Sequence, residues 1–274
     1  NRLDFTNFLD VEIDNAKRHN RLIALLLIDL DNFKNVNDTH GHQVGDELLR
    51  EVSKRLKESV RKRDAINRPS AEHLVSRLGG DEFAIVLTEL DSPENAAVVA
   101  RRMIQSVNKP VVISGSGEAQ VGVSIGIACY PDSGANAEEL CRSADLAMYD
   151  AKNKGKNTYR FFSKKLNAAH EYHTMIETGI KNALKTEKFY MVYQPIVDLA
   201  TQKTVAFEAL CRCDLKAIQK IPTQDFILVA EESGLMMELG VKILNMVLQD
   251  AKETLLPCCP DLEIHVNVST RQLQ

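Results

Sequence analysis

The sequence predicts a mixed α/β fold of the α+β type, divided into two successive units. Short apolar runs of strand length alternate with longer stretches whose apolar residues recur at helical spacing. A charged stretch without proline, residues 163–188, separates two such alternations and predicts a linker helix between them. The chain has 274 residues, of which 44% are hydrophobic, and this is enough for two domains with buried cores.

The first unit, residues 1–162, is expected to open with a helix and a buried strand. Residues 3–20 carry a helical stripe of apolar side chains, and residues 22–30 form an apolar run that meets Asp29 near its end. A polar loop is predicted at 31–45. The next helix is predicted at 46–60, because its leucines and valines fall on one face.

A hairpin is expected around Gly79-Gly80, with short strands at 73–78 and 83–87. The periodicity beyond the hairpin predicts, in order, a helix at 93–107, a strand at 121–129, a helix at 137–152 and a strand at 158–162. This order of elements contains the βαββαβ sequence and therefore predicts a ferredoxin-like core with additions.

The second unit, residues 189–274, repeats the alternation of strands and helices after the linker helix. Its pattern predicts strands at 190–197, 204–210 and 263–268, and helices at 223–233 and 236–253. Such an alternation is typical of the start of a (β/α) barrel, which usually needs about 250 residues. We therefore expect an incomplete (β/α) barrel in this part of the chain.

The composition excludes several classes of protein. A formal net charge of −4, with 26% charged residues, gives no sign of a nucleic-acid polymer as partner. No apolar run approaches the roughly 20 residues that cross a bilayer, and no secretory signal is visible. The six cysteines form no CxxC pair, which disfavours a zinc site and predicts reduced thiols in a cytoplasmic compartment.

Acidic residues and glycines gather at two predicted strand ends. Asp29 ends a buried strand, where a carboxylate is costly unless it is paired or binds a metal. Asp81 and Glu82 follow Gly79 and Gly80, whose lack of side chains lets the backbone approach a ligand. Carboxylates and nucleotide phosphates are the usual environment of Mg²⁺. Taken singly, each piece also fits a plain turn or a loop anchor.

Three motifs that occur in the order of a known family favour the metal site over a plain turn or a loop anchor. Residues 29–38, with Gly41-His42 and Gly45-Asp46, resemble the nucleotide-binding segment of the GGDEF family of diguanylate cyclases. Residues 79–83 match the signature of that family, and residues 144–152 are similar to its late helix. The resemblance covers residues 1–162 and implies a nucleotide-cyclase core.

The resemblance also implies roles for individual residues. Asp29, Asp81 and the carbonyl of Leu30 would hold Mg²⁺ or Mn²⁺, and Glu82 would support the metal site and catalysis. Lys34 is placed with Asp81 and Glu82 among the catalytic residues. The expected substrate-binding residues of this unit are Asn32, Phe33, Asn37, His42, Asp46, Gly79, Gly80, Lys152 and Lys156. Asn37 and Asp46 would read the guanine edge, and the lysines would contact phosphates.

The implied reaction joins two GTP molecules into cyclic di-GMP and releases two pyrophosphates. Each 3′-hydroxyl attacks the α-phosphate of the other nucleotide, so catalysis is mainly positioning and charge neutralisation. Because one domain holds one GTP, turnover is expected to require a homodimer. A sensor upstream of this chain is expected to supply regulation.

Two departures from the family pattern affect phosphate sites. The late helix is followed by Gly155-Lys156-Asn157, where the family has arginine in the middle, and lysine cannot make its bidentate phosphate contact. Arg61 and Asp64 fit the letters of the inhibitory product site of the family, but extra residues near 69–77 separate them from the hairpin. The same letters also fit a charged helix end.

A second resemblance lies in the second unit. Tyr193-Gln194-Pro195, Glu208-Ala209-Leu210 with Arg212, and Asn267-Val268-Ser269 resemble the start of an EAL-type cyclic di-GMP phosphodiesterase. The resemblance implies that Glu208 and Asn267 bind metal and that Arg212 contacts ligand phosphate. The later acidic ligands of that family would lie beyond residue 274, and Cys213 stands where the family has tryptophan. This chain by itself is therefore expected not to hydrolyse cyclic di-GMP.

Two functions remain in competition. The first is an active diguanylate cyclase. The second is a GTP-binding regulatory domain that tunes an attached phosphodiesterase. A purely structural interaction domain ranks last, because it leaves the matched polar segment at 29–46 unexplained.

Overall fold

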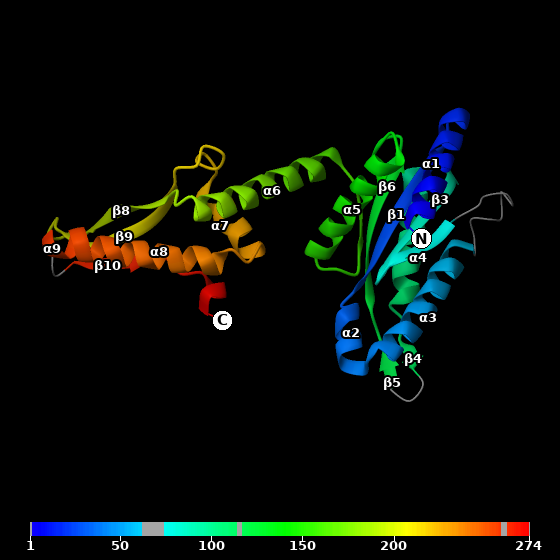
Figure 1. Cartoon of the computed structure of the whole chain (residues 1–274), viewed down its shortest axis with the longest axis horizontal. Coiled ribbons are helices and arrows are strands. Elements are labelled where there is room, and N and C mark those ends of the chain that lie inside the picture. Colours follow the sequence, from blue (N-terminus) through cyan, green and yellow to red (C-terminus); the bar gives the residue numbers. More distant parts are fainter. Residues whose placement is uncertain (1, 62–73, 114–116, 259–261, 274) are drawn as a thin grey trace. The chain divides into compact units, whose positions relative to one another are not determined.

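The computed structural model describes residues 2–61, 74–113, 117–258 and 262–273. The chain forms two compact units, Asn1–Ala168 and Ala169–Gln274. The first unit is a layered α/β structure, and most of its elements are labelled in Figure 1. The elements of this unit are α1 (Arg2–His19), β1 (Leu22–Asp31), α2 (Phe33–His40), α3 (His42–Arg61), β2 (Leu74–Gly79), β3 (Glu82–Leu90), α4 (Pro93–Val107), β4 (Val111–Ile113), β5 (Gly117–Ala119), β6 (Gly122–Tyr130), α5 (Ala137–Asn153) and β7 (Tyr159–Phe161).

A five-stranded sheet with the order β2-β3-β1-β6-β7 forms the centre of the first unit. The strand β1 runs antiparallel to both neighbours, β3 and β6, whereas β6 and β7 are parallel. The predicted ferredoxin-like α+β core is confirmed. Because β1 lies inside the sheet and an apolar core covers each face, almost all of its residues are buried, which explains why its sequence is a continuous apolar run.

Each face of the sheet has its own apolar core. Leu26 and Ile28 of β1 belong to the cluster packed under α3 and α4. Leu25 and Leu27, which point to the opposite face, belong to the cluster under α1 and α5. The same alternation directs Asp29, near the end of β1, toward the face covered by α5. A helix on that face can therefore supply a partner for the Asp29 carboxylate.

Gly126 allows α5 to approach β6 closely. A Cβ atom at Gly126 would lie 1.9 Å from the carbonyl oxygen of Ala144 and 2.3 Å from the backbone nitrogen of Met148. These are backbone atoms of α5, which cannot move independently of the helix. A side chain at position 126 would therefore displace α5 together with Lys152 near its C-terminus.

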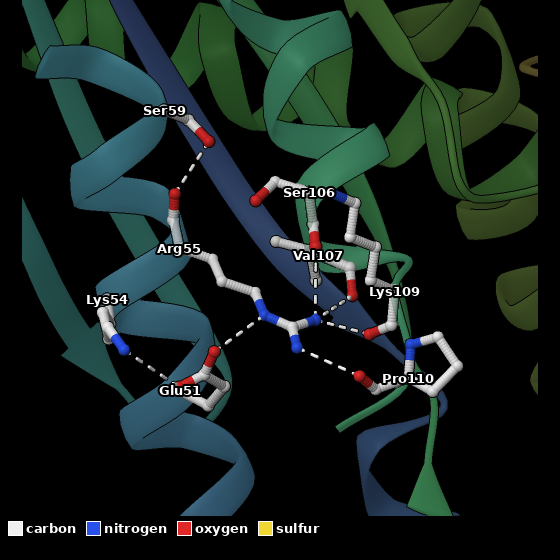
Figure 2. A network of polar contacts seen from close by, with 8 residues as sticks. All are labelled: Glu51, Lys54, Arg55, Ser59, Ser106, Val107, Lys109 and Pro110. Atoms are coloured by element: carbon white, nitrogen blue, oxygen red, sulfur yellow. Dashed lines mark hydrogen bonds and ion pairs between the residues drawn. The ribbon is translucent and has the colours of Figure 1, made fainter. Parts of the chain in front are cut away.

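Arg55 of α3 joins two elements on the other face of the sheet (Figure 2). Its guanidinium donates from Nε to Oε1 of Glu51, one helical turn earlier, at 3.0 Å. It donates to the carbonyls at and beyond the C-terminus of α4, namely those of Ser106, Val107, Lys109 and Pro110. The last carbonyls of a helix have no partner within the helix, so one cation satisfies several of them at once.

The loop predicted at 31–45 is wrong, because most of this segment is helical. Asn32 adopts a left-handed conformation, with φ of 61°, and turns the chain directly from β1 into α2. The helix has only eight residues and buries Phe33, with Val36 packed against the core. Residue 42, not residue 46, begins α3. The small hairpin of β4 and β5 was not predicted either, because its three-residue strands are too short to show periodicity.

The second unit contains a three-stranded sheet with the order β10-β9-β8. Strands β8 and β9 form an antiparallel hairpin, and β9 and β10 are parallel, with helices between them in the chain. The described residues of this unit form no closed barrel. The chain enters this unit within α6 (Lys164–Lys185). The elements that follow are β8 (Phe189–Val197), β9 (Thr204–Cys213), α7 (Thr223–Glu232), α8 (Met236–Asp250), a π-helical turn (Ala251–Leu255), α9 (Leu256–Cys258), β10 (Glu263–Val266) and a 3₁₀ turn (Thr270–Leu273).

Among the described residues, no helix has the length and apolar content to cross a membrane.

Candidate functional site

The two predicted acidic strand ends meet at one edge of the first sheet. Asp29 of β1 is the register partner of Glu82 of β3. The backbone N–H of Leu30 donates to the carbonyl oxygen of Asp81 at 3.3 Å, which extends the β1–β3 pairing to the hairpin turn. The structure thus brings together Asp29, Leu30, Asp81 and Glu82, although Asp29 and Asp81 are 52 positions apart in the chain.

A lysine from α5 pairs with the β1 carboxylate. Lys152 Nζ lies 2.7 Å from Oδ2 of Asp29, whose side chain is only 13% exposed. Burial raises the pKa of Asp29 above its ordinary value, and the charges of Asp81 and Asp31 act in the same direction. The hydrogen bond and charge of Lys152 oppose this rise in pKa without cancelling it. The carboxylates of Asp29, Asp31 and Asp81 thus outnumber the one lysine that pairs with Asp29. This excess of negative charge favours a bound cation.

The hairpin turn is held by an arginine that no sequence motif indicates. Gly80 has a φ of 53°, a left-handed conformation in which glycine carries no penalty. The guanidinium of Arg77 donates to the carbonyl oxygen of Gly80 from Nε at 2.9 Å and from Nη2 at 2.7 Å. This double contact fixes the turn that presents Asp81 and Glu82. A contact of this kind leaves no sequence signal beyond the nearness of an arginine to the glycines.

Gly45 makes room for Asn37 between α2 and α3. A Cβ atom at Gly45 would lie 1.9 Å from Oδ1 of Asn37 and 3.2 Å from Cζ of Phe33. Gly41, which joins the two helices, has a φ of 85°, a value that glycine adopts without penalty. Asn37 is therefore half-buried against the start of α3, beside the exposed Asp46.

The other polar residues expected to bind substrate lie on two connected segments. Lys34 and His42 are exposed in the first turns of α2 and α3. Lys156, in the turn after α5, donates from Nζ to Oδ1 of Asn32 at 2.9 Å. The junction of β1 and α2 and the turn after α5 are thus adjacent, and both face the edge of the sheet that carries Asp29.

Glu82 also borders a cavity of about 730 Å³ on the sheet face covered by α1 and α5. Leu78, Arg142 and Asp145 are among its lining residues. Glu82 is exposed, so its carboxylate is accessible to a bound molecule from this side.

The oxygen atoms at this edge fit a hard divalent cation. Two carboxylates, Asp29 and Asp81, and the Leu30 carbonyl are the type of donor that Mg²⁺ and Mn²⁺ prefer. In the described parts of the chain, no three His, Cys, Asp or Glu side chains form a metal-binding cluster. The protein would therefore contribute few ligands, and phosphate oxygens and water would complete the shell, as is usual for Mg²⁺ with nucleotides.

In the second unit, the two residues expected to bind metal are in contact. Nδ2 of Asn267 donates to Oε1 of Glu208 at 2.8 Å. Arg212 lies four residues further along β9 and donates to the carbonyl of Cys211 at 2.9 Å. Tyr193, at the matched Tyr-Gln-Pro segment, donates from its hydroxyl to Oδ2 of Asp250 at 2.7 Å. The proposed inhibitory pair at 61 and 64 lies outside the residues whose side chains the structure describes.

The comparisons with known proteins follow this division. Residues 1–158 match the family model described as "Diguanylate cyclase, GGDEF domain", and residues 178–274 match "EAL domain". The chain is 36% identical, over its whole length, to an "Uncharacterized signaling protein" of Caulobacter vibrioides, of which it covers 32%. It is 35% identical over 99% of its length to the "Bifunctional diguanylate cyclase/cyclic di-GMP phosphodiesterase MucR" of Pseudomonas aeruginosa, of which it covers 38%. The chain thus spans about a third of these relatives.

Solved structures of GGDEF domains also match this chain. The GGDEF domain of PA1120 from Pseudomonas aeruginosa is 32% identical, with a TM-score of 0.57, and the match covers 62% of this chain and 94% of that domain. The "active GGEEF domain of a diguanylate cyclase from Vibrio cholerae" is 26% identical, with a TM-score of 0.52, over 60% of this chain and 97% of the other. The chain belongs to the GGDEF family of diguanylate cyclase domains, and the first part of an EAL domain follows in the same chain.

Proposed function

We propose that the first unit condenses two GTP molecules into cyclic di-GMP and two pyrophosphates, and that the protein acts in cyclic di-GMP signalling. The observation that carries this proposal is the convergence of Asp29, the Leu30 carbonyl and Asp81 at the ends of β1 and β3. The family to which the chain belongs supports the same activity. We also propose residues 1–162 as the cyclase domain, 163–188 as the linker helix and 189–274 as the partial EAL domain.

The proposed site holds the triphosphate between two segments that each contribute lysine. Asp29, Asp81 and the Leu30 carbonyl would hold Mg²⁺ or Mn²⁺. The bound cation would neutralise charge on the reacting phosphates. Lys34 and the backbone of Asn32 and Phe33 would contact the phosphates from the start of α2. Lys152 and Lys156 would contact them from the end of α5. Glu82, next to Asp81, would keep the metal ligands in place and support proton removal from the attacking hydroxyl.

The base would be read at the α2–α3 junction. The half-buried amide of Asn37 can donate and accept a hydrogen bond, and the carboxylate of Asp46 accepts two donors. Guanine presents N1–H and N2–H₂ donors on one edge, which matches this pair, and His42 lies close by. Adenine lacks these adjacent donors, so the same residues would select GTP over ATP.

A second protomer is part of the proposed mechanism. One domain offers one set of nucleotide-binding residues, and the 3′-hydroxyl of each GTP must meet the α-phosphate of the other. Two copies of the first unit must therefore face each other during turnover. The described cysteines are free thiols, which supports a cytoplasmic compartment for this reaction.

Product analysis tests the proposal. Incubation of the chain with GTP and Mg²⁺ should yield cyclic di-GMP at a rate that rises with protein concentration. Asp81→Ala should abolish the product, whereas Glu58→Ala, which removes an exposed carboxylate from α3, should leave the rate unchanged. Absence of cyclic di-GMP at high concentrations of the unsubstituted protein would reject the cyclase.

A regulatory role for the first unit is the second candidate. The contact between Asn267 and Glu208 supports a phosphodiesterase site in the whole protein, and one relative with 30% identity is named "Cyclic di-GMP phosphodiesterase NbdA". In this case GTP would bind to the first unit without turnover and change the hydrolysis of cyclic di-GMP. Hydrolysis by the full-length protein, measured with and without GTP, separates the two candidates, because only the regulatory role predicts GTP dependence without synthesis.

A further inference from the structure

A buried carboxylate that the proposed mechanism does not use lies next to the site. Asp31 is the last residue of β1 and is only 4% exposed. Its Oδ1 accepts a hydrogen bond from Oγ of Ser124 at 2.7 Å, and its Oδ2 accepts one from the backbone nitrogen of Asn157 at 2.8 Å. A buried carboxylate is costly unless its oxygens are hydrogen-bonded, so both contacts are needed to hold it there.

The turn bound by Asp31 has an uncommon backbone conformation. Gly155, Lys156 and Asn157 have φ values of 107°, 59° and 45°. Glycine adopts such values freely, but two consecutive non-glycine residues in the left-handed region persist only where surrounding contacts enforce them. The Lys156 N–H is held by the carbonyl of Ala151 at 3.1 Å, and the Asn157 N–H is held by Asp31.

The enforced turn aims one side chain at the proposed phosphate site. Lys156 reaches Asn32, which follows Asp31 in the chain and is itself left-handed. Asp31 therefore connects the two segments that the proposed function places on the triphosphate, the β1–α2 junction and the turn after α5. Gly122 leaves room for this contact, since a Cβ atom there would lie 3.0 Å from Oδ2 of Asp31 and 3.1 Å from Cβ of Asn157.

We propose that Asp31 is a positioning residue for GTP, which acts by holding the 155–157 turn so that Lys156 faces the phosphates. This inference rests on the proposed function, because it assumes that the site binds GTP. It assigns Asp31 no contact with substrate or metal. Its effect must therefore appear in GTP affinity and must depend on the presence of the Lys156 side chain.

The test measures binding of a non-hydrolysable GTP analogue, with Mg²⁺, to variants of the whole chain. Asp31→Ala removes both acceptors and should weaken binding about tenfold, the scale expected for a lost charge-assisted hydrogen bond. Asp31→Asn should restore binding to within about threefold, because its amide oxygen can accept from Asn157 while its NH₂ donates to Ser124. In a Lys156→Ala background, Asp31→Ala should add no further loss.

Matched variants separate positioning from folding. Ser124→Ala keeps the contact between Asp31 and Asn157, so it should lower the Tm but leave GTP affinity within about twofold. If Asp31→Ala does not fold, Gly122→Ala replaces it, because its methyl group presses Asp31 and Asn157 apart and should weaken binding in the same Lys156-dependent way.

Unchanged affinity in Asp31→Ala, or a loss that adds fully to that of Lys156→Ala, would overturn the inference. Failure of the unsubstituted chain to bind the analogue would overturn the proposed function, and the inference with it. Binding without synthesis of cyclic di-GMP would reject only the cyclase, and the variants would still decide the role of Asp31.

Discussion

Lys152 Nζ lies 2.7 Å from Oδ2 of Asp29, so a cation of α5 neutralises the carboxylate that is proposed to bind metal. A divalent cation on Asp29 would repel Lys152, and the arriving triphosphate would offer this lysine a new partner. The same side chain can therefore stabilise the unliganded site and then contact phosphate, without a change in the position of α5.

The contact between Lys152 and Asp29 predicts an energetic coupling that a double-mutant cycle can measure. Lys152→Met should lower the thermal stability of the first unit at pH 7, because it leaves a mostly buried carboxylate without its counter-charge. The same substitution in an Asp29→Asn background should have almost no effect, which gives a coupling on the order of 1 kcal/mol for this partly exposed pair. Calorimetry of the four proteins provides the measurement, and equal losses in both backgrounds would contradict the prediction.

A second prediction concerns the cost of keeping Asp29 ionised. The pKa of Asp29 is raised by burial above its ordinary 3.8, so the folded unit holds the proton more tightly than the unfolded chain does. Its negative charge therefore destabilises the fold at pH values above the raised pKa, and the penalty fades as the pH falls through that pKa toward 3.8.

Asp29→Asn should accordingly raise the Tm at pH 7 while it abolishes synthesis of cyclic di-GMP. The gain in Tm should shrink as the pH is lowered, because the carboxylate of the unsubstituted protein becomes neutral as well. Thermal denaturation between pH 7 and pH 4 measures both trends. A lower Tm for Asp29→Asn at pH 7 would show that the ion pair with Lys152 outweighs the effect of burial.

A substitution at Gly45 should weaken substrate binding without lowering the thermal stability of the first unit. The methyl carbon of Gly45→Ala would lie only 1.9 Å from the present position of Oδ1 of Asn37. The Asn37 side chain must therefore turn away from that position. Alanine is also favoured over glycine within a helix by about 1 kcal/mol, so α3 should not be weakened. We expect the KM for GTP to rise about tenfold or more, the scale of one or two lost hydrogen bonds to the base, with an unchanged or higher Tm.

The dependence on Asn37 supplies the control for this prediction. If the methyl group acts by displacing Asn37, then Gly45→Ala should have little further effect on the KM of an Asn37→Ala protein. Equal increases in KM in both backgrounds would mean that Gly45 affects binding by another route.

Long elements with one clear period were predictable from the sequence, and short or strained ones were not. The predicted helix at 93–107 is observed as Pro93–Val107, because proline marks its start and its apolar residues repeat over four turns. The helix α2 has eight residues with few apolar positions, and it starts from a left-handed Asn32, so its sequence is similar to that of a loop. Its stability comes from burial of Phe33, which is a tertiary effect.

The candidate site likewise combines a contact that was expected from the sequence with contacts that only the three-dimensional structure reveals. The family resemblance implied that Asp29 and Asp81 hold one metal ion, and the structure brings the end of β1 and the hairpin turn together. The contact of Asp31 with Asn157 joins residues 126 positions apart, through a turn whose backbone angles no composition signal reveals. Gly45 and Gly122 likewise matter through atoms of distant residues, so their importance is visible only in three dimensions.

Hydrogen bonds of Arg55 hold α3 to the end of α4, so its replacement should destabilise the first unit (Figure 2). Arg55→Met keeps the aliphatic part of the side chain but removes every donor, and the carbonyls at the end of α4 lose a shared charged partner. We expect the first unit to lose about 2–3 kcal/mol of unfolding free energy, the range for hydrogen bonds to a charged group whose partners are partly buried. Lys54→Met, one position away on the exposed side of α3, should cost less than about 0.5 kcal/mol, because its contact with Glu51 is 4.0 Å long and solvent-exposed. Denaturant unfolding of the two variants provides the comparison, and equal small losses would show that water replaces the guanidinium at these carbonyls.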